Sequence, residues 1–353
     1  MQSAPLMISS VLQFASRAHP DREIVSRLVD EPLWRYGWSD CEARAKKAAQ
    51  LLTSLGVCAG DRVSTLAWNT HRHLELFYAA PGIGAVLHTA NPRLSEDQIV
   101  YTINHAGSEV LFFERSFVAL VRKLRPRLPK VRRFIMLTDG ERLDRSFDGA
   151  ASYETMLTEH DGRLDWPVFD ENAGAFLCYT SGTTGDPKGV LYSHRSVVLH
   201  AVAAGLSGAF GFTAFDVIMP CQSIYHATAW GLPFTAAVNG CGLVLPCDKF
   251  DGASIQELIR EEGVTFSGGV PTIWTMYLAH LEKTGEKPGR LERLVIGGSA
   301  VPRAMAETFK KKYGVRVLQI WGIVLGLVDQ KATWSHMADG IEMWTVRPRG
   351  TNS

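Results

Sequence analysis

Short apolar runs alternate with helix-length segments along most of the chain, and this alternation limits the fold more than any other feature. Residues 110–113, 175–179 and 242–245 are examples of the apolar runs, and segments long enough for helices lie between such runs. Runs of this length that end at turn residues are typical of buried strands. Strands that alternate with helices form βα units around a largely parallel sheet. We therefore expect an α/β fold.

The chain divides most naturally near residue 170. Residues 139–172 are polar and rich in Asp, Glu and Gly, which predicts a connector between subdomains. We expect a first α/β subdomain over residues 1–170 and a second over 171–322. Two helix starts are also predicted, because Ser39 with Glu42 and Ser95 with Gln98 have the spacing of capping boxes.

Composition excludes several classes of protein. The 353 residues carry a net charge of only +1, so we expect no nucleic-acid partner and no binding to anionic membranes. The six cysteines lack metal-binding spacing, and the first ten residues lack the pattern of a signal peptide, so we expect a reduced, cytoplasmic protein. Residues 196–215 and 217–247 carry no charged side chain, but His, Gly and Pro interrupt them, which favours core segments over a transmembrane segment.

A loop rich in glycine and hydroxyl side chains, here called the glycine loop (residues 180–188), follows the apolar run 175–179. Glycines let successive backbone N–H groups point at one spot, and Lys188 adds a cation suited to phosphate oxygens. The spacing is not that of the common P-loop, which needs Gly, four residues and then Gly-Lys-Ser/Thr. A solvated hairpin turn is the alternative interpretation.

The full order Thr-Ser-Gly-Thr-Thr-Gly-Asp-Pro-Lys-Gly resembles the phosphate-binding signature of the AMP-forming acyl-CoA synthetase family, which also includes luciferases and peptide-synthetase adenylation domains. The resemblance implies two stacked βα subdomains with largely parallel sheets, as in the N-terminal domain of that family. It also implies ATP and Mg²⁺ as cofactors, with Thr180 meeting the metal. The implied phosphate-binding residues are Thr180, Ser181, Gly182, Thr183, Thr184, Gly185 and Lys188.

The resemblance extends to an acyl site. His226 follows a Pro-x-x-x-x-Tyr run and resembles the family residue beside the reacting carboxylate, so it is the candidate catalytic residue. Ala227 lies next to it, and Trp230 resembles a wall of the acyl pocket. A satisfied core histidine is the alternative for His226. Residues 268–272 resemble the border of the acyl channel, and a turn leading into a helix N-cap is a compatible interpretation.

Two further segments resemble the family's adenine site. Both follow predicted strands, and ligands of open α/β sheets bind outside the carboxyl ends of strands. The implied residues are Gly298, Ser299, Ala300, Gln319, Trp321 and Gly322.

The match ends at about residue 322. Val324 and Leu325 stand where the family has Thr and a Glu that helps to hold Mg²⁺, and apolar side chains cannot ligate a hard cation. Residues 323–353 resemble no part of the family, so we expect an unrelated tail. The family's ribose-binding acid and its C-terminal domain with the catalytic lysine are expected to be absent from this chain.

The resemblance implies a two-step reaction, in which a carboxylic acid and ATP give acyl-AMP and pyrophosphate, and CoA then displaces AMP. Residues 66–75 and 91–94 resemble the fatty-acyl branch, including medium- to long-chain and methylmercaptopropionate ligases. We expect this chain to be impaired or inactive, above all in the step that uses CoA. A non-catalytic nucleotide- or acyl-binding protein and an unstable fragment are the alternatives, and a homodimer is left open.

Overall fold

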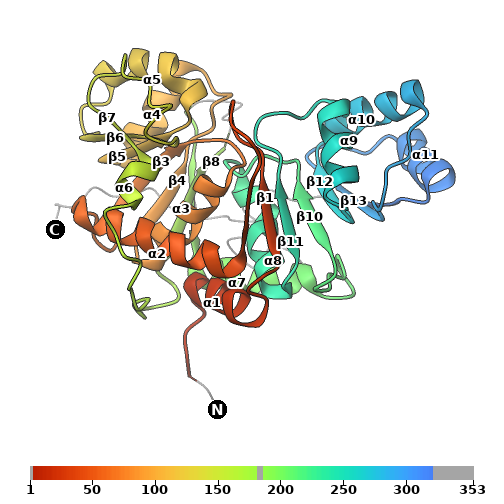
Figure 1. Ribbon diagram of the computed structural model, residues 1–353, viewed down its shortest axis with the longest axis horizontal. Helices are drawn as coiled ribbons and strands as arrows, with labels where there is room; N and C mark the ends of the chain where they lie inside the picture. The colour runs from red at the N-terminus through yellow and green to blue at the C-terminus, as the bar shows by residue number, and fades with distance from the viewer. Residues whose placement is uncertain (1–2, 181–185, 321–353) are drawn as a thin grey trace.

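The computed structural model describes residues 3–180 and 186–320, and these residues build two seven-stranded sheets (Figure 1). Sheet I has the order β7-β6-β5-β3-β4-β8-β9, and only β8 and β9 are antiparallel neighbours. Its strands are β3 (Arg62–Leu66), β4 (Val86–Thr89), β5 (Val110–Phe113), β6 (Arg133–Met136), β7 (Ala150–Ser152), β8 (Gly174–Tyr179) and β9 (Gly189–Ser193).

Sheet II has the order β14-β13-β12-β10-β11-β1-β2, and only β1 and β2 are antiparallel neighbours. Its strands are β1 (Glu23–Ser26), β2 (Trp34–Gly37), β10 (Val217–Pro220), β11 (Gly242–Leu245), β12 (Phe266–Gly269), β13 (Arg293–Ile296) and β14 (Arg316–Gln319). The expectation of a largely parallel α/β fold is therefore confirmed.

The helices connect the strands and cover the sheets. The α-helices are α1 (Ile8–Ala18), α2 (Trp38–Ser54), α3 (His71–Gly82), α4 (Glu96–Ala106), α5 (Val118–Leu124), α6 (Tyr153–Leu157), α7 (His194–Gly205), α8 (Leu232–Asn239), α9 (Gly252–Glu261), α10 (Pro271–Thr284) and α11 (Arg303–Tyr313). Three short 3₁₀ turns are η1 (Arg115–Phe117), η2 (Arg125–Arg127) and η3 (Ala227–Gly231).

Residue 170 does not separate the two sheets. Strands β1 and β2 precede it but belong to sheet II, whereas β8 and β9 follow it but belong to sheet I. The chain therefore starts in sheet II, builds sheet I and returns to sheet II. The segment 139–172 also contains β7 and α6, so it is more than a connector.

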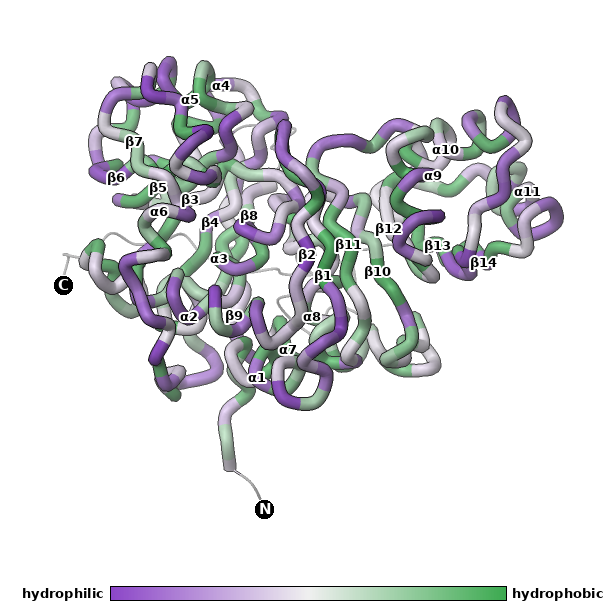
Figure 2. Tube along the Cα trace, in the orientation of Figure 1, coloured by the Kyte–Doolittle hydropathy of each residue, from purple (hydrophilic) through white to green (hydrophobic). Residues whose placement is uncertain are grey.

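The largest hydrophobic core lies between the sheets. Helix α3 is buried along its whole length and contacts strands of both sheets (Figure 1). Its Phe77 ring lies 4.9 Å from the Phe176 ring of β8 and 5.9 Å from the Phe234 ring of α8, measured between centroids. Both sheets thus pack on one shared helical layer, and the strands that face it are strongly apolar (Figure 2).

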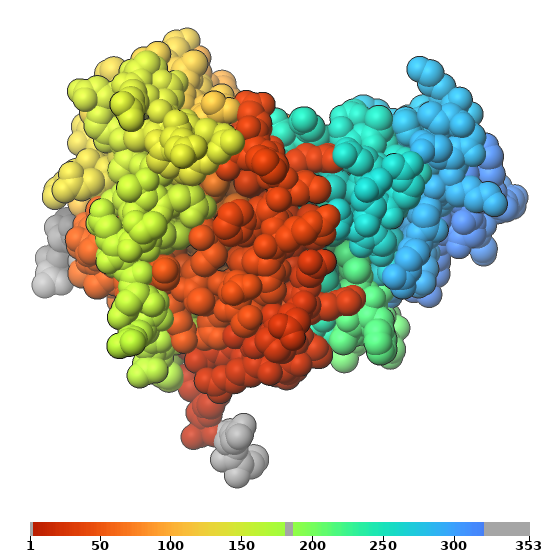
Figure 3. All heavy atoms as spheres, viewed as in Figure 1, coloured from red at the N-terminus to blue at the C-terminus, as the bar shows by residue number. Residues whose placement is uncertain are grey.

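Sheet II is covered on its second face as well. Along β13, Val295 faces the inter-sheet core, while Leu294 and Ile296 face a separate core under α9, α10 and α11. Strand residues alternate between faces in this way, and a parallel sheet buried on both faces reads as a continuous apolar run. Helices α9–α11 with β12–β14 form a lobe that projects from the body of the molecule (Figures 1 and 3).

No helix among residues 3–180 and 186–320 combines the length and the apolar content that crossing a membrane requires. The two uncharged segments instead fold as the short elements α7, β10, α8 and β11.

Candidate functional site

The segments singled out from the sequence all follow the carboxyl ends of strands. The glycine loop follows β8 in sheet I, and the other segments follow β10, β12, β13 and β14 in sheet II. The two sets of strand ends meet, because the Cys247 N–H after β11 donates to the Asn69 carbonyl after β3 at 3.0 Å. The candidate site is therefore assembled from both sheets.

The neck of the glycine loop is closed by two hydrogen bonds. The Thr180 N–H donates to the Lys188 carbonyl at 3.0 Å, and the Lys188 N–H donates to Thr180 Oγ1 at 3.2 Å. These bonds extend the β8–β9 pairing, and the Lys188 side chain is exposed. Predicted phosphate-binding residues 181–185 lie outside the described residues.

The segment after His226 has an unusual backbone. Ala227, Thr228, Ala229 and Trp230 have φ between 46° and 54°, in the left-handed region that non-glycine residues avoid. A left-handed conformation costs an L-residue about 1–2 kcal/mol. Gln222 holds the turn, because its Nε2 donates to the Ala229 carbonyl at 2.9 Å. Strain of this kind is typical of functional sites.

The His226 side chain is exposed, so it is not a core histidine. The protein around the imidazole still excludes part of its water, and this desolvation lowers the pKa of His226 from its ordinary value. The ring is therefore neutral near pH 7, so that one of its nitrogens can donate a hydrogen bond and the other can accept one. Ala227 beside it is buried, and the Trp230 side chain is half-buried.

Two glycines bring the sheet II segments together after β13. A Cβ on Gly297 would lie 2.7 Å from Ile320 Cγ1 and 3.3 Å from the Trp230 ring, so only glycine fits there. Gly298 has φ +83°, and a Cβ on it would lie 3.2 Å from Val270. The segments after β10, β12, β13 and β14 therefore converge on these two glycines.

The remaining predicted adenine-site residues lie beside this point. Ser299 and Ala300 are exposed directly after Gly298. Gln319 ends β14, pairs with Ile296 of β13 and is also exposed. Trp321 and Gly322 lie outside the described residues, as do Val324 and Leu325.

Sequence reasoning gave no site role to three buried polar residues at the strand ends. They are Asn69 after β3, Thr89 at the end of β4, and Gln222 after β10. The signal that could have found them is a polar residue directly after an apolar strand, on the side of the sheet where the glycine loop emerges. Among the described residues, no three His, Cys, Asp or Glu side chains are grouped so as to hold a metal ion.

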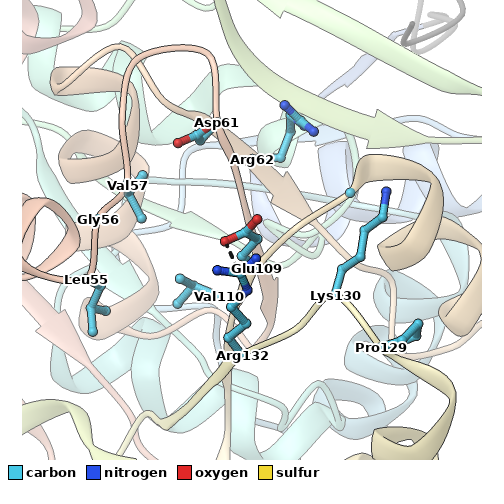
Figure 4. A pocket seen from close by; sticks show the side chains of 11 residues that line it. Leu55, Gly56, Val57, Asp61, Arg62, Glu109, Val110, Pro129, Lys130 and Arg132 are labelled. Carbon is cyan, nitrogen blue, oxygen red and sulfur yellow. Dashed lines mark ion pairs between the residues drawn. The ribbon is translucent and has the colours of Figure 1, made fainter. Parts of the chain in front are cut away.

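A cavity of about 440 Å³ lies at the opposite end of sheet I (Figure 4). It opens where β3, β5 and β6 begin, whereas the glycine loop emerges where β8 ends. Its charged lining is mixed: Arg62, Lys130 and Arg132 line it together with Asp61 and Glu109, and Arg132 forms an ion pair with Glu109. The location and the mixed charge separate this cavity from the candidate site.

Comparison with known proteins shows the family of the chain. Residues 12–323 match the model of a family described as AMP-binding enzyme. The chain is 46% identical over 324 residues to a 3-methylmercaptopropionyl-CoA ligase of Ruegeria lacuscaerulensis, covering 92% of this chain and 60% of that protein. It is 42% identical to a medium-chain-fatty-acid–CoA ligase of Ectopseudomonas oleovorans, covering 92% and 59%.

The fold agrees with solved structures. An anthranilate CoA ligase in complex with anthranoyl-AMP superposes with a TM-score of 0.82 at 20% identity, covering 93% of this chain and 62% of that one. The chain spans about three fifths of the length of the curated relatives it matches. From the match over residues 12–323 and these identities, the chain belongs to the AMP-binding enzyme family, as the glycine loop and its neighbouring strand ends predicted.

Proposed function

We propose that this chain is the N-terminal adenylation part of an AMP-forming acyl-CoA ligase that activates a fatty or related carboxylic acid. The observation that carries the proposal is the convergence of five segments at the carboxyl ends of two sheets. The closed neck at Thr180 and Lys188, the exposed His226 and the exposed Gly298 each follow the carboxyl end of a strand. Names of the curated relatives support acids of the methylmercaptopropionate and medium-chain type.

The residues at these strand ends are of types that suit a nucleoside triphosphate. Lys188 and the glycine loop would hold the β- and γ-phosphates, because the exposed Lys188 cation at the end of a glycine-rich sequence suits phosphate oxygens. Gly298 is exposed and has no side chain, so a flat base can lie against its backbone, and Gln319 and Trp321 are the other residues proposed to frame that base. Mg²⁺, when bound, would neutralise charge that gathers on the phosphates, and Thr180 would be one of its ligands.

His226 and Trp230 would act on the other substrate. A neutral imidazole at the site's edge can donate a hydrogen bond to the carboxylate and orient one oxygen for attack on the α-phosphorus. Trp230, half-buried against Gly297, would form a wall of the acyl pocket. Holding both reactants in line supplies most of the catalysis expected of such a site.

Thioester formation by the 353-residue chain alone is expected to be weak or absent. Val324 and Leu325 offer no oxygen for a cation, and the residues after 322 do not continue the family pattern. This departure also supports a second candidate function, a protein that binds nucleotide or acid without turnover. The free cysteines Cys41, Cys58, Cys178, Cys221, Cys241 and Cys247 support a cytoplasmic location, and a homodimer remains a prediction.

The test measures carboxylate-dependent exchange of pyrophosphate into ATP, and acyl-CoA formation separately, with octanoate and 3-methylmercaptopropionate as the acids. Titration calorimetry measures MgATP binding in parallel. We expect Lys188→Ala to reduce MgATP affinity by about tenfold or more. Lys283 is an exposed residue near the end of α10, and Lys283→Ala should leave the affinity unchanged. Binding without exchange would favour the second candidate, and no MgATP binding would overturn both. Robust acyl-CoA formation would contradict the expected impairment.

A further inference from the structure

The candidate site is divided between two sheets, so something must fix their relative position. The glycine loop follows β8 of sheet I in the sequence, whereas His226 and Gly297–Gly298 follow strands of sheet II. Attack of a carboxylate on a phosphate needs the two groups aligned at about 3–3.5 Å. Side chains that join the sheets at their carboxyl ends are therefore candidates for positioning residues.

Asn69 joins the two sheets through both polar atoms of its side chain. It follows β3 and is fully buried. Its Nδ2 donates to the carbonyls of Pro220 and Gln222, both at 3.0 Å. Its Oδ1 accepts from the Ile224 N–H at 2.9 Å. One side chain of sheet I thus holds three backbone groups in the turn that leads from β10 of sheet II to His226.

Thr89 holds the next residue of the same turn. It ends β4, and its Oγ1 donates to the Tyr225 carbonyl at 3.1 Å. The same hydroxyl lies 3.5 Å from Cys178 Sγ on β8, the strand that carries the glycine loop. The backbone directly before His226 is therefore tied to sheet I at four points, close to the origin of the glycine loop.

We propose that Asn69, supported by Thr89, is the positioning residue that sets the His226 turn of sheet II against the carboxyl end of β8 in sheet I. The inference rests on the proposed function, because it assigns the turn a role in holding the carboxylate. The physical basis is that Asn69 satisfies two carbonyls and one N–H that are out of reach of water. Without it, these buried groups would move to find other partners.

The experiment compares Asn69→Ala with a control that removes a similar buried junction far from the site. Thr265 is 3% exposed and lies just before β12, at the opposite end of sheet II. Its Oγ1 donates to Asp216 at 2.7 Å and accepts from the Val217 N–H at 3.1 Å. Thr265→Ala should therefore destabilise the fold without moving the His226 turn.

Two measurements report on position rather than stability. The first is the titration of the His226 imidazole by NMR in the full chain, assigned with His226→Gln. The second is the separate affinity for octanoate and for MgATP, measured by calorimetry. We expect Asn69→Ala to move the His226 pKa toward 6.5 and to weaken octanoate binding about tenfold or more, with a smaller effect on MgATP. Thr265→Ala should change neither.

Thr89→Val keeps the shape of the side chain but loses the hydrogen bond to the Tyr225 carbonyl. It should therefore shift the His226 pKa and the octanoate affinity in the same direction as Asn69→Ala, but by smaller amounts. It also provides the test if Asn69→Ala does not fold. The proposal is overturned if His226 titrates identically in the wild-type, Asn69→Ala and Thr89→Val proteins. If the wild-type chain binds neither octanoate nor MgATP, the proposed function fails, whereas the His226 titration still decides the role of Asn69.

Discussion

The Arg44 guanidinium donates two hydrogen bonds to the Glu75 carboxylate, from Nε to Oε1 at 2.7 Å and from Nη2 to Oε2 at 3.2 Å. No part of the Glu75 side chain reaches solvent. Tyr153 OH also donates to Oε2 at 2.8 Å, so α2, α3 and α6 meet at this one carboxylate. Because Glu75 is fully buried and the Arg44 side chain is only 19% exposed, the Glu75 charge depends on its partner far more than a charge in a surface pair does.

Arg44→Met should therefore leave an uncompensated buried carboxylate and lower the free energy of unfolding by about 3–5 kcal/mol. Lys123→Met is the matched control, because Lys123 pairs with Glu96 at 2.7 Å on the surface. That change should cost less than about 1 kcal/mol. Urea unfolding at pH 7 measures both, and equal effects would contradict the prediction.

Glu114 should make stability depend on pH. Burial raises the pKa of its carboxyl to about 7, although Thr70 Oγ1 donates to it at 3.0 Å. Between pH 4.5 and 7 the unfolded chain releases this proton while the folded protein keeps it, so stability falls as pH rises. The fall is about 1.4 kcal/mol per pH unit. Glu114→Gln keeps the acceptor for Thr70 and should remove that slope in urea unfolding; parallel curves would contradict the assignment.

Gly297→Ala should disturb the predicted adenine site. The added Cβ would lie 2.7 Å from Ile320 Cγ1 and 3.1 Å from the Ile320 carbonyl oxygen, which is backbone and cannot swing away. We expect MgATP affinity to fall about tenfold or more. Gly314→Ala is the control, because Gly314 also prefers to remain glycine at φ +73° but has open space around it. Its change should cost stability only, so equal losses of affinity would argue against an adenine site here.

Two serines with the same predicted role should behave differently. Ser95 Oγ accepts from the Gln98 N–H at 3.3 Å, and Gln98 Oε1 accepts from the Ser95 N–H at 3.2 Å, as the sequence predicted. Ser95→Ala should cost about 1 kcal/mol. Ser39 lies inside α2 and donates to the Pro20 carbonyl at 3.3 Å instead. Ser39→Ala should cost less, and thermal unfolding of the two variants checks the difference.

The Ser39 case shows why local patterns placed elements well but missed some boundaries. The predicted capping box of Ser39 and Glu42 is wrong, because α2 begins at Trp38 with Gly37 as its N-cap, and the Asp40 carboxylate accepts from the Gly37 N–H at 3.2 Å. Trp38 is fully buried, and its Nε1 donates to the Cys241 carbonyl at 3.0 Å. A long-range contact of this kind is absent from any local pattern, and it anchors the first turn of the helix.

The strand ends of the candidate site were predictable, but the contacts that build it were not. Glycines and hydroxyls after apolar runs predict a nucleotide site there, because strand ends are recognisable locally. The left-handed turn at Ala227–Gly231 was not predictable, since Thr, Ala and Trp have no preference for positive φ. The role of Asn69 was equally hidden, because its partners at Pro220, Gln222 and Ile224 are far away in the sequence.

Strands of the two sheets are interleaved in the sequence, and this order has a consequence for folding. Strand β1 pairs with β11, with Ile24 opposite Leu243, so a strand from the beginning of the chain must wait for a partner made much later. During synthesis on the ribosome, β2 can pair with one edge of this apolar strand early, but the edge that pairs with β11 stays open while sheet I is already being completed. Such delayed pairing slows folding and favours aggregation. Newly made chains should therefore depend on chaperones until β10 and β11 have emerged.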